Sequence, residues 1–269
     1  MLEACLGLLF GLLIGSFLNV CIYRMPQDLS VVRPRSFCTA CKHPIAWYDN
    51  VPLLSYVLLG GRCRYCKAAI SARYPAVELL TGALFFFYVW RLGPTLPAVK
   101  FCLYGALLVG LIFADLEERI LPDELTLGGA AAGLALAWFV PVKDGMAEAV
   151  LWLAGLQWNQ QWISVTEAAL GAAVPSFFLF LGGWLYLKLR HKEGLGLGDV
   201  KLMAMIGAFL GLRGALLTLI FGSVLGSVIG YAYIRITGKD ASSYELPFGT
   251  FLGAAGIAIT LVGRAALAW

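Results

Sequence analysis

Charged residues and histidines are scarce in this sequence. Only 13% of its 269 residues are Asp, Glu, Lys or Arg, and two are histidine. Soluble domains of this length average about a quarter charged residues, so an ordinary soluble domain is excluded. With His43 and His191 as the whole supply of imidazole, no Ser-His-Asp or Cys-His catalytic group is plausible. No cation precedes Arg24, which predicts that the first apolar run is not a cleavable signal peptide.

Long apolar runs are what the chain has in excess. Hydrophobic residues make up 60% of it, with a mean hydropathy of +0.81, and they fall into runs that can cross about 30 Å of hydrocarbon. We predict an all-α integral membrane protein with about eight transmembrane helices. The spans lie near 2–22, 76–92, 98–115, 125–141, 166–188, 199–212, 214–235 and 247–267.

The sixth of these runs is short. At about 1.5 Å per residue it covers only about 21 Å, so residues 199–212 are expected to form a half-sunk or re-entrant helix.

The Lys and Arg residues set the expected orientation. With the N-terminus outside and Lys201 left aside, fourteen of them fall on the inner side and five on the outer side. Cytoplasmic loops carry the excess of Lys and Arg, so both termini are predicted outside and the polar segment 24–75 in the cytoplasm. The expected partner of these apolar runs is a lipid bilayer. The net charge of +4 is explained by the topology in that bilayer, so no nucleic-acid partner is needed to account for it.

Glycines recur at every fourth position in two of the runs. Such ladders let the backbones of membrane helices approach closely, so we read them as packing surfaces. They are Gly7, Gly11 and Gly15 in the first run, and Gly222, Gly226 and Gly230 in the seventh.

The segment 24–75 contains two C-x2-C pairs, Cys38 with Cys41 and Cys63 with Cys66, separated by twenty-one residues. Four thiolates at about this spacing can hold zinc tetrahedrally, and a cytoplasmic location disfavours disulfides. A site closed by four thiolates has no open position, so it would stabilise a small domain and would not catalyse. A metal-free cluster or a redox pair is the alternative. The predicted domains are therefore a first helix (1–23), a zinc-binding insert (24–75) and a polytopic membrane domain (76–269).

Acids at the edges of apolar runs are the best pointers to function in a membrane protein. Asp115 follows "CLYGALLVGLIFA" and Asp199 stands in "GLGLGDVKL", both at cytoplasmic ends of predicted spans. If they meet, one proton is shared between them; the ionised member can activate water and the protonated one can polarise a carbonyl. The alternative for Asp115 is a solvated helix end.

The glycines before Asp199 are expected to serve a substrate. Gly194, Gly196 and Gly198 allow backbone conformations closed to other residues and let another chain approach without obstruction. A loose loop beside the acid suits a protease that must unwind its substrate. A flexible connection is the alternative.

Two further charged residues have a supporting part in this prediction. Asp123 follows Pro122 just before an apolar run, where an N-cap is expected. Lys201 either pairs with Asp199 or reaches to the membrane interface.

These residues resemble a known family. "GLGLGDVKL" is similar to the GxGD motif of membrane-embedded aspartic proteases. The whole chain resembles the bacterial type IV prepilin peptidases (leader peptidase/N-methyltransferases). The resemblance also rests on "GSFLNVCIYRMP" (15–26), the two cysteine pairs, "ARYPAVELLTG" (72–82) and "DLEERILPDELTL" (115–127), in the family's order.

The resemblance implies an enzyme of the bacterial cytoplasmic (inner) membrane. Such enzymes cleave the leader of type IV prepilins and type II secretion pseudopilins after a glycine, on the cytoplasmic face. The catalytic aspartates carry over onto Asp115 and Asp199. Most members also N-methylate the new N-terminal residue with S-adenosylmethionine, and Glu78 lies in the region tied to methylation. Asp123 belongs to the LPD element and is not one of the catalytic pair.

Methylation rests on the resemblance alone, because no GxGxxG segment that opens on a strand is present. A peptidase without methylation is therefore one alternative. A proton-coupled transporter that uses Asp115, Asp199 and Glu78 as a relay is another, against which the lack of inverted repeats counts. A non-catalytic assembly protein is the third.

Overall fold

The described part of the chain is helical. The computed structural model describes residues 1–153, 155, 158–191, 196–237 and 246–262. Within these residues no strand forms, and the only β pairing consists of two isolated bridges, Phe37 with Pro44 and Arg62 with Ala69. The all-α prediction is confirmed.

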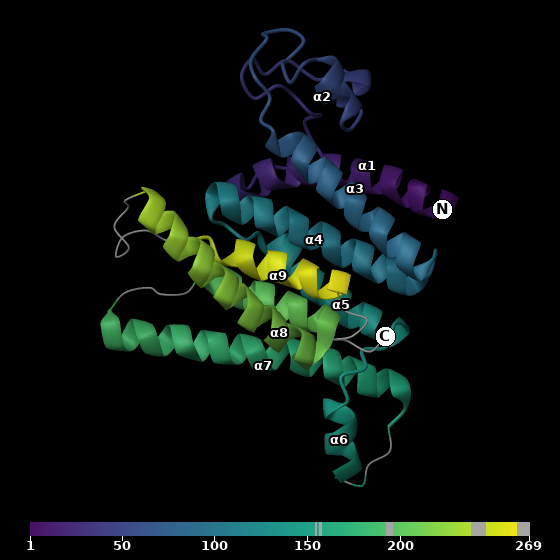
Figure 1. Ribbon diagram of the computed structural model, residues 1–269, viewed down its shortest axis with the longest axis vertical. Helices are drawn as coiled ribbons and strands as arrows, with labels where there is room; N and C mark the ends of the chain where they lie inside the picture. Colours follow the sequence, from purple (N-terminus) through teal and green to yellow (C-terminus); the bar gives the residue numbers. More distant parts are fainter. Residues whose placement is uncertain (154, 156–157, 192–195, 238–245, 263–269) are drawn as a thin grey trace. The chain divides into compact units, whose positions relative to one another are not determined.

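Five helices of the described part are long and apolar enough to cross a membrane. They are α1 (Leu2–Arg24, continued by the 3-10 turn η1, Met25–Gln27), α3 (Arg73–Leu92), α4 (Leu96–Glu118), α7 (Gln160–Arg190) and α8 (Leu197–Thr237) (Figure 1). A shorter apolar helix, α9 (Phe248–Val262), follows them. The chain is therefore a multi-pass membrane protein, and the number of about eight crossings stays a prediction.

The remaining helices are shorter or less apolar. They are α5 (Asp123–Phe139), α6 (Met146–Leu153), the small α2 (Leu54–Leu58) and the 3-10 turn η2 (Trp47–Asn50).

The chain divides into two compact units, Met1–Ala114 and Asp115–Trp269, with the division inside α4. The predicted division at residues 23 and 75 separated segments by their expected place in the membrane, and it stays a prediction.

In the first unit α1 packs along α3, as Figure 1 shows. A Cβ built on Gly11 would lie 2.8 Å from Cβ of Phe85, and one on Gly15 would lie 2.7 Å from Cα of Glu78. Real Cβ atoms do not approach other atoms so closely, so the glycines are what allow the two helices to touch. The first predicted ladder is confirmed, and it brings the middle of α1 against Glu78.

In the second unit α5, α7 and α9 all pack against α8. The second predicted ladder faces α9, since a Cβ on Gly222 would lie 2.9 Å from the Leu252 side chain and one on Gly226 3.1 Å from the Phe251 ring. This ladder is confirmed as a packing surface as well.

Helix α8 is interrupted at Gly211, two residues before the predicted boundary between the spans 199–212 and 214–235. Gly211 has φ 76° and ψ −175°, a backbone conformation that glycine adopts most readily. Beyond the break, the backbone N–H of Arg213 donates to Oδ2 of Asp144 at 2.7 Å. The carboxylate thus satisfies one of the free donors at the start of the second part.

The α1–α3 contact can be tested with a matched pair of glycines. We expect Gly11→Ala to destabilise the protein by about 1–3 kcal/mol, because the added methyl group overlaps Phe85 and Gly82. Gly182→Ala in α7 is the control, since no atom of the described residues lies within 4 Å of its built Cβ. The measurement is the thermal unfolding midpoint in detergent, and equal midpoints for the two variants would contradict the close contact.

Candidate active site and metal centre

Asp115 lies on α4, one turn before the helix ends at Glu118, and it is only 6% exposed. Its Oδ2 accepts two hydrogen bonds from one residue, from the backbone N–H of Thr250 at 2.6 Å and from its hydroxyl at 2.8 Å. The alternative of a solvated helix end is therefore wrong, because this carboxylate is buried and held.

The start of α9 explains why the carboxylate sits there. Thr250 is in the first turn of α9, where backbone N–H groups have no acceptor within the helix and the helix dipole is positive. A Cβ on the preceding Gly249 would lie 3.2 Å from Oδ2 of Asp115 and 3.0 Å from the Leu121 side chain. Glycine at this position therefore lets the helix end approach the acid closely.

Asp199 lies in the first turn of α8 and is half-buried. The backbone of Gly196 hydrogen-bonds to its carboxylate, and the N–H of Asp199 donates to the Gly196 carbonyl at 3.2 Å. The loop immediately before α8 therefore holds the second acid in place.

The structure brings the two carboxylates together inside the second unit. Asp115 is close enough to act on Asp199 electrostatically. Leu121, from the connection between α4 and α5, touches both sides of the pair: a Cβ on Gly198 would lie 3.2 Å from its side chain, and one on Gly249 3.0 Å. Two acids separated by more than eighty positions in the sequence thus share one site.

Lys201 pairs with Asp123, and this differs from both sequence expectations. Its Nζ lies 2.7 Å and 2.8 Å from the two carboxylate oxygens of Asp123. The N-cap prediction for Asp123 is wrong: Pro122 is the N-cap of α5, no side chain caps the helix, and the Asp123 carboxylate is turned to the lysine. Half-exposed pairs contribute about 0–1 kcal/mol, so this one aligns the starts of α5 and α8 more than it stabilises them.

The glycines near Asp199 occupy two different places. Gly196 is exposed and precedes α8, whereas Gly198 belongs to the helix and packs on Leu121. Gly194 lies outside the described residues.

The four predicted metal ligands form one cluster. The Sγ atoms of Cys38, Cys41, Cys63 and Cys66 all lie within 4.8 Å of one another, and those of Cys38 and Cys66 are 3.8 Å apart. Tetrahedral coordination with metal–sulfur bonds of about 2.3 Å requires sulfurs about 3.8 Å apart. The cluster can therefore hold a metal ion that is coordinated tetrahedrally by four thiolates.

Both cysteine pairs are built in the same way. The N–H of Lys42 donates to the Cys38 carbonyl at 2.8 Å, and that of Lys67 to the Cys63 carbonyl at 3.1 Å. The backbone of both lysines has a positive φ, 59° in Lys42 and 60° in Lys67. Hydrogen bonds from the backbone of Cys66 and Tyr65 lower the pKa of the Cys63 thiol to about 7, which favours the thiolate that binds metals.

His43 packs against Tyr65, with ring centroids 3.6 Å apart and the rings tilted by 40°, and it is not part of the cluster.

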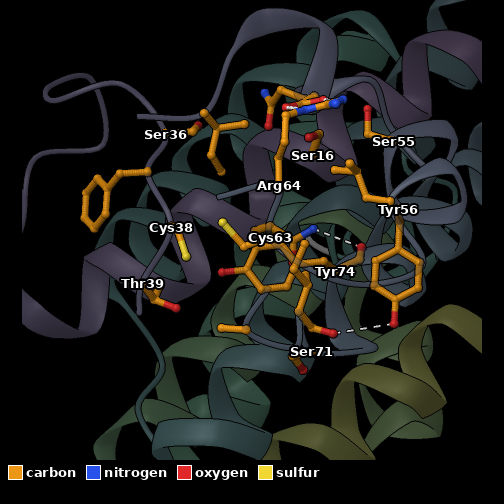
Figure 2. A pocket seen from close by; sticks show the side chains of 18 of the residues that line it. Ser16, Ser36, Cys38, Thr39, Ser55, Tyr56, Cys63, Arg64, Ser71 and Tyr74 are labelled. Carbon is orange, nitrogen blue, oxygen red and sulfur yellow. Dashed lines mark hydrogen bonds and ion pairs between the residues drawn. The ribbon is translucent and has the colours of Figure 1, made fainter. Parts of the chain in front are cut away.

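A cavity of about 310 Å³ lies in the first unit, beside the cysteine cluster. Figure 2 shows Ser16, Tyr74, Cys38 and Cys63 around it. Glu78 of α3 also lines it, 8% exposed, and its Oε2 accepts the N–H of Leu53 at 2.8 Å. Glu78 is therefore in another unit than the aspartate pair, in a cavity of its own.

Three functional candidates were missed by the sequence reasoning, namely Asn19, Arg24 and Thr250. Arg24 is buried, and its guanidinium donates to the carbonyls of Ser30, Pro34 and Arg35, which fastens the chain that leads to Cys38. Each of the three is a polar residue in or beside an apolar run. This position points to function for neutral and basic residues as it does for Asp115 and Asp199.

The fold and the site define a class: a multi-pass membrane protein with a carboxylate pair in one unit and a four-cysteine centre in the other. The chain belongs to the type IV leader peptidase family. Residues 101–231 match that family, and residues 9–92 match the bacterial Peptidase A24 N-terminal domain.

Curated relatives named prepilin leader peptidase/N-methyltransferase are similar over most of the chain. One from Myxococcus xanthus is 43% identical over 87% of this chain, which spans 64% of that relative's length. One from Aeromonas salmonicida is 35% identical over 97% of this chain and 91% of its own length. One from Pseudomonas aeruginosa is 33% identical over 93% of this chain and 87% of its own length. No solved structure matches the chain.

The cysteine cluster predicts a defined metal content. We expect about one metal ion per purified chain by elemental analysis, and its loss in Cys38→Ser and Cys66→Ser, because a three-sulfur site is open to water and binds more weakly. Cys102→Ser is the matched control, since this buried cysteine belongs to α4 and not to the cluster. A wild-type metal content in Cys38→Ser would contradict the site.

Proposed function

We propose that this chain cleaves the leader peptides of type IV prepilins and type II secretion pseudopilins after a glycine, with Asp115 and Asp199 as the catalytic pair. The observation that carries the proposal is the meeting of two carboxylates from the end of α4 and the start of α8 in one unit. Membership of the leader peptidase family and the names of its relatives support the choice of substrate.

The pair supplies acid and base chemistry in one place. Two carboxylates that interact electrostatically share one proton, since both cannot easily be ionised. The ionised member takes a proton from water as the water oxygen attacks the scissile carbonyl carbon, and the protonated member donates its proton to the carbonyl oxygen. The C–N bond then breaks: the leaving amine takes a proton from the acid that accepted it, and a hydroxyl of the intermediate returns a proton to the other acid, which restores the pair.

Thr250 orients one member of the pair. Because both of its donors bind Oδ2 of Asp115, the other oxygen is not engaged by Thr250 and can take part in the proton transfer. Thr250 is thus a positioning residue, and the pair of Lys201 with Asp123 holds the start of α8 against the start of α5.

The orientation follows from the positive-inside rule. The cysteine domain and the aspartate pair face the cytoplasm, and both termini lie outside the inner membrane of a bacterium.

We propose further that the first unit methylates the new N-terminal amine, with S-adenosylmethionine as donor of the methyl group. Glu78 lies in a cavity large enough for an amino-acid-sized group, and its carboxylate is available to accept the proton that the methylated amine releases. The metal in the cysteine cluster is zinc, whose preferred sulfur geometry the cluster matches. Its part is to stabilise the segment that forms the cavity wall.

The aspartate pair is tested by single isosteric changes. Asp115→Asn and Asp199→Asn should each slow cleavage of a synthetic precursor by about 10²–10⁴-fold, the range for loss of a general acid or base. Glu124→Gln, an exposed acid in the first turn of α5, is the control and should cleave normally. Near-normal cleavage by either Asn variant would remove the pair from the mechanism.

Mass spectrometry of the product with and without S-adenosylmethionine tests methylation, and a product that stays unmethylated identifies a peptidase alone.

Thr250 is tested by removing one donor at a time. Thr250→Val keeps the backbone N–H and loses the hydroxyl, so kcat should fall about 10- to 100-fold, the value of a hydrogen bond to a charged group. KM should change little, because the bond is made to the catalytic acid and not to the substrate. Thr250→Ser keeps both donors and should restore kcat. If Val and Ser behave alike, the hydroxyl does not position Asp115.

A further inference from the structure

Among the described residues, the buried side chain of Asn19 has a hydrogen-bond acceptor that meets no donor. Asn19 lies on α1, 2% exposed, and lines the cavity of the first unit. Its Nδ2 donates to the carbonyls of Tyr74 at 3.0 Å and Gly15 at 3.3 Å. Since both partners are acceptors, the NH₂ end of the amide must be the end that faces them.

The opposite end of the amide is unsatisfied. In the described part of the chain, Oδ1 of Asn19 is buried and has no hydrogen-bond partner. Buried acceptors are nearly always paired, and an unpaired one is destabilising. A bound molecule that donates a hydrogen bond to this oxygen would remove that cost.

A carboxylate without a cation lies in the same cavity. Among its described contacts, Glu78 meets only neutral donors, the N–H of Leu53 and the hydroxyl of Ser16. Leu53 has φ 58° and ψ −49°, and a leucine rarely adopts a positive φ. The loop that carries Leu53 is therefore held in an unfavourable shape to aim its N–H at this acid.

The positive groups that line the cavity are engaged elsewhere. Arg24 donates to three backbone carbonyls. Arg64 holds Asp49 through two hydrogen bonds of 2.7 Å and 2.6 Å, and this pairing lowers the pKa of Asp49. The cavity therefore offers a negative charge and a free acceptor, but its cations are already paired.

Such a cavity suits a cation that carries N–H donors. A buried carboxylate is stabilised by an opposite charge, a carbonyl oxygen by an N–H donor, and an ammonium group also interacts with aromatic rings. The rings of Tyr56 and Tyr74 line the same cavity (Figure 2). A volume of about 310 Å³ is at the low end of small-molecule pockets and fits an amino-acid-sized group.

We propose that Asn19 Oδ1 and Glu78 form a binding site for the ammonium group of an amino-acid moiety. The proposal rests on the methylation half of the proposed function and adds Asn19 as a residue that recognises an amine. Two reactants of that half carry such a group: the new N-terminal amine of the cleaved substrate, and the amino-acid end of S-adenosylmethionine. In either case Asn19 accepts an N–H and Glu78 balances the charge.

The experiment compares ligands with and without the amine. Equilibrium binding to the full chain in lipid nanodiscs is measured for S-adenosylhomocysteine and its desamino analogue. It is measured equally for a peptide with a free N-terminal phenylalanine and its N-acetylated form. In the wild type the amine should strengthen binding at least about tenfold in one of these ligand pairs, the value of a charge-assisted hydrogen bond. The pair that responds identifies the source of the amine.

Two variants of Asn19 separate recognition from structure. Asn19→Asp and Asn19→Leu both lose the Nδ2 donors to Tyr74 and Gly15, but only the Asp variant keeps an acceptor. The tenfold preference for the amine should persist in Asn19→Asp and fall to within about twofold in Asn19→Leu. Damage to packing alone would weaken both ligands of a pair and both variants together, leaving the preference unchanged.

The outcomes distinguish this proposal from the proposed function. If the wild type methylates its product but Asn19→Leu keeps the preference in both ligand pairs, the ammonium site is wrong and the methyltransferase assignment stands. The site is equally wrong if the wild type shows no preference for the amine in either pair. A wild type that binds the amine by preference and does not methylate supports the site and overturns the methylation half.

Discussion

The two hydrogen bonds from Thr250 to Asp115 are the contact on which the candidate active site depends. A carboxylate that is 6% exposed in an apolar protein is costly unless donors meet it. The start of α9 offers donors that no residue of its own helix can satisfy. One contact therefore satisfies a buried acid and a helix end together, and it ties the last described helix to the first acid of the pair.

The first unit repeats the same solution at another acid. Glu78 is held by the N–H of Leu53, as Asp115 is held by that of Thr250. In both places a backbone donor far away in the sequence fixes a carboxylate on a membrane helix. Backbone donors orient the acid without neutralising its charge, which leaves it available for a proton or a cationic ligand.

Glycine makes these arrangements possible. Helices in lipid gain little from burying apolar surface against each other, so they associate through close packing. Gly15 brings α1 against Glu78, and Gly249 brings α9 against Asp115. The glycines that hold the helices together are thus the ones that set the positions of the acids, and packing and chemistry cannot be changed independently at these two points.

The sequence by itself determined the helical membrane class, the four thiols and the two acids, because apolar runs, short cysteine spacings and misplaced charges are local patterns. Only the tertiary structure decided the partners. Lys201 binds Asp123, 78 positions away, and Thr250 binds Asp115, 135 positions away. Nothing local distinguishes Asp123 from Asp199 as a partner for Lys201, or marks Asn19 as an acceptor without a donor. Such choices depend on which helix ends meet, and that follows from the packing of α5 and α9 against α8.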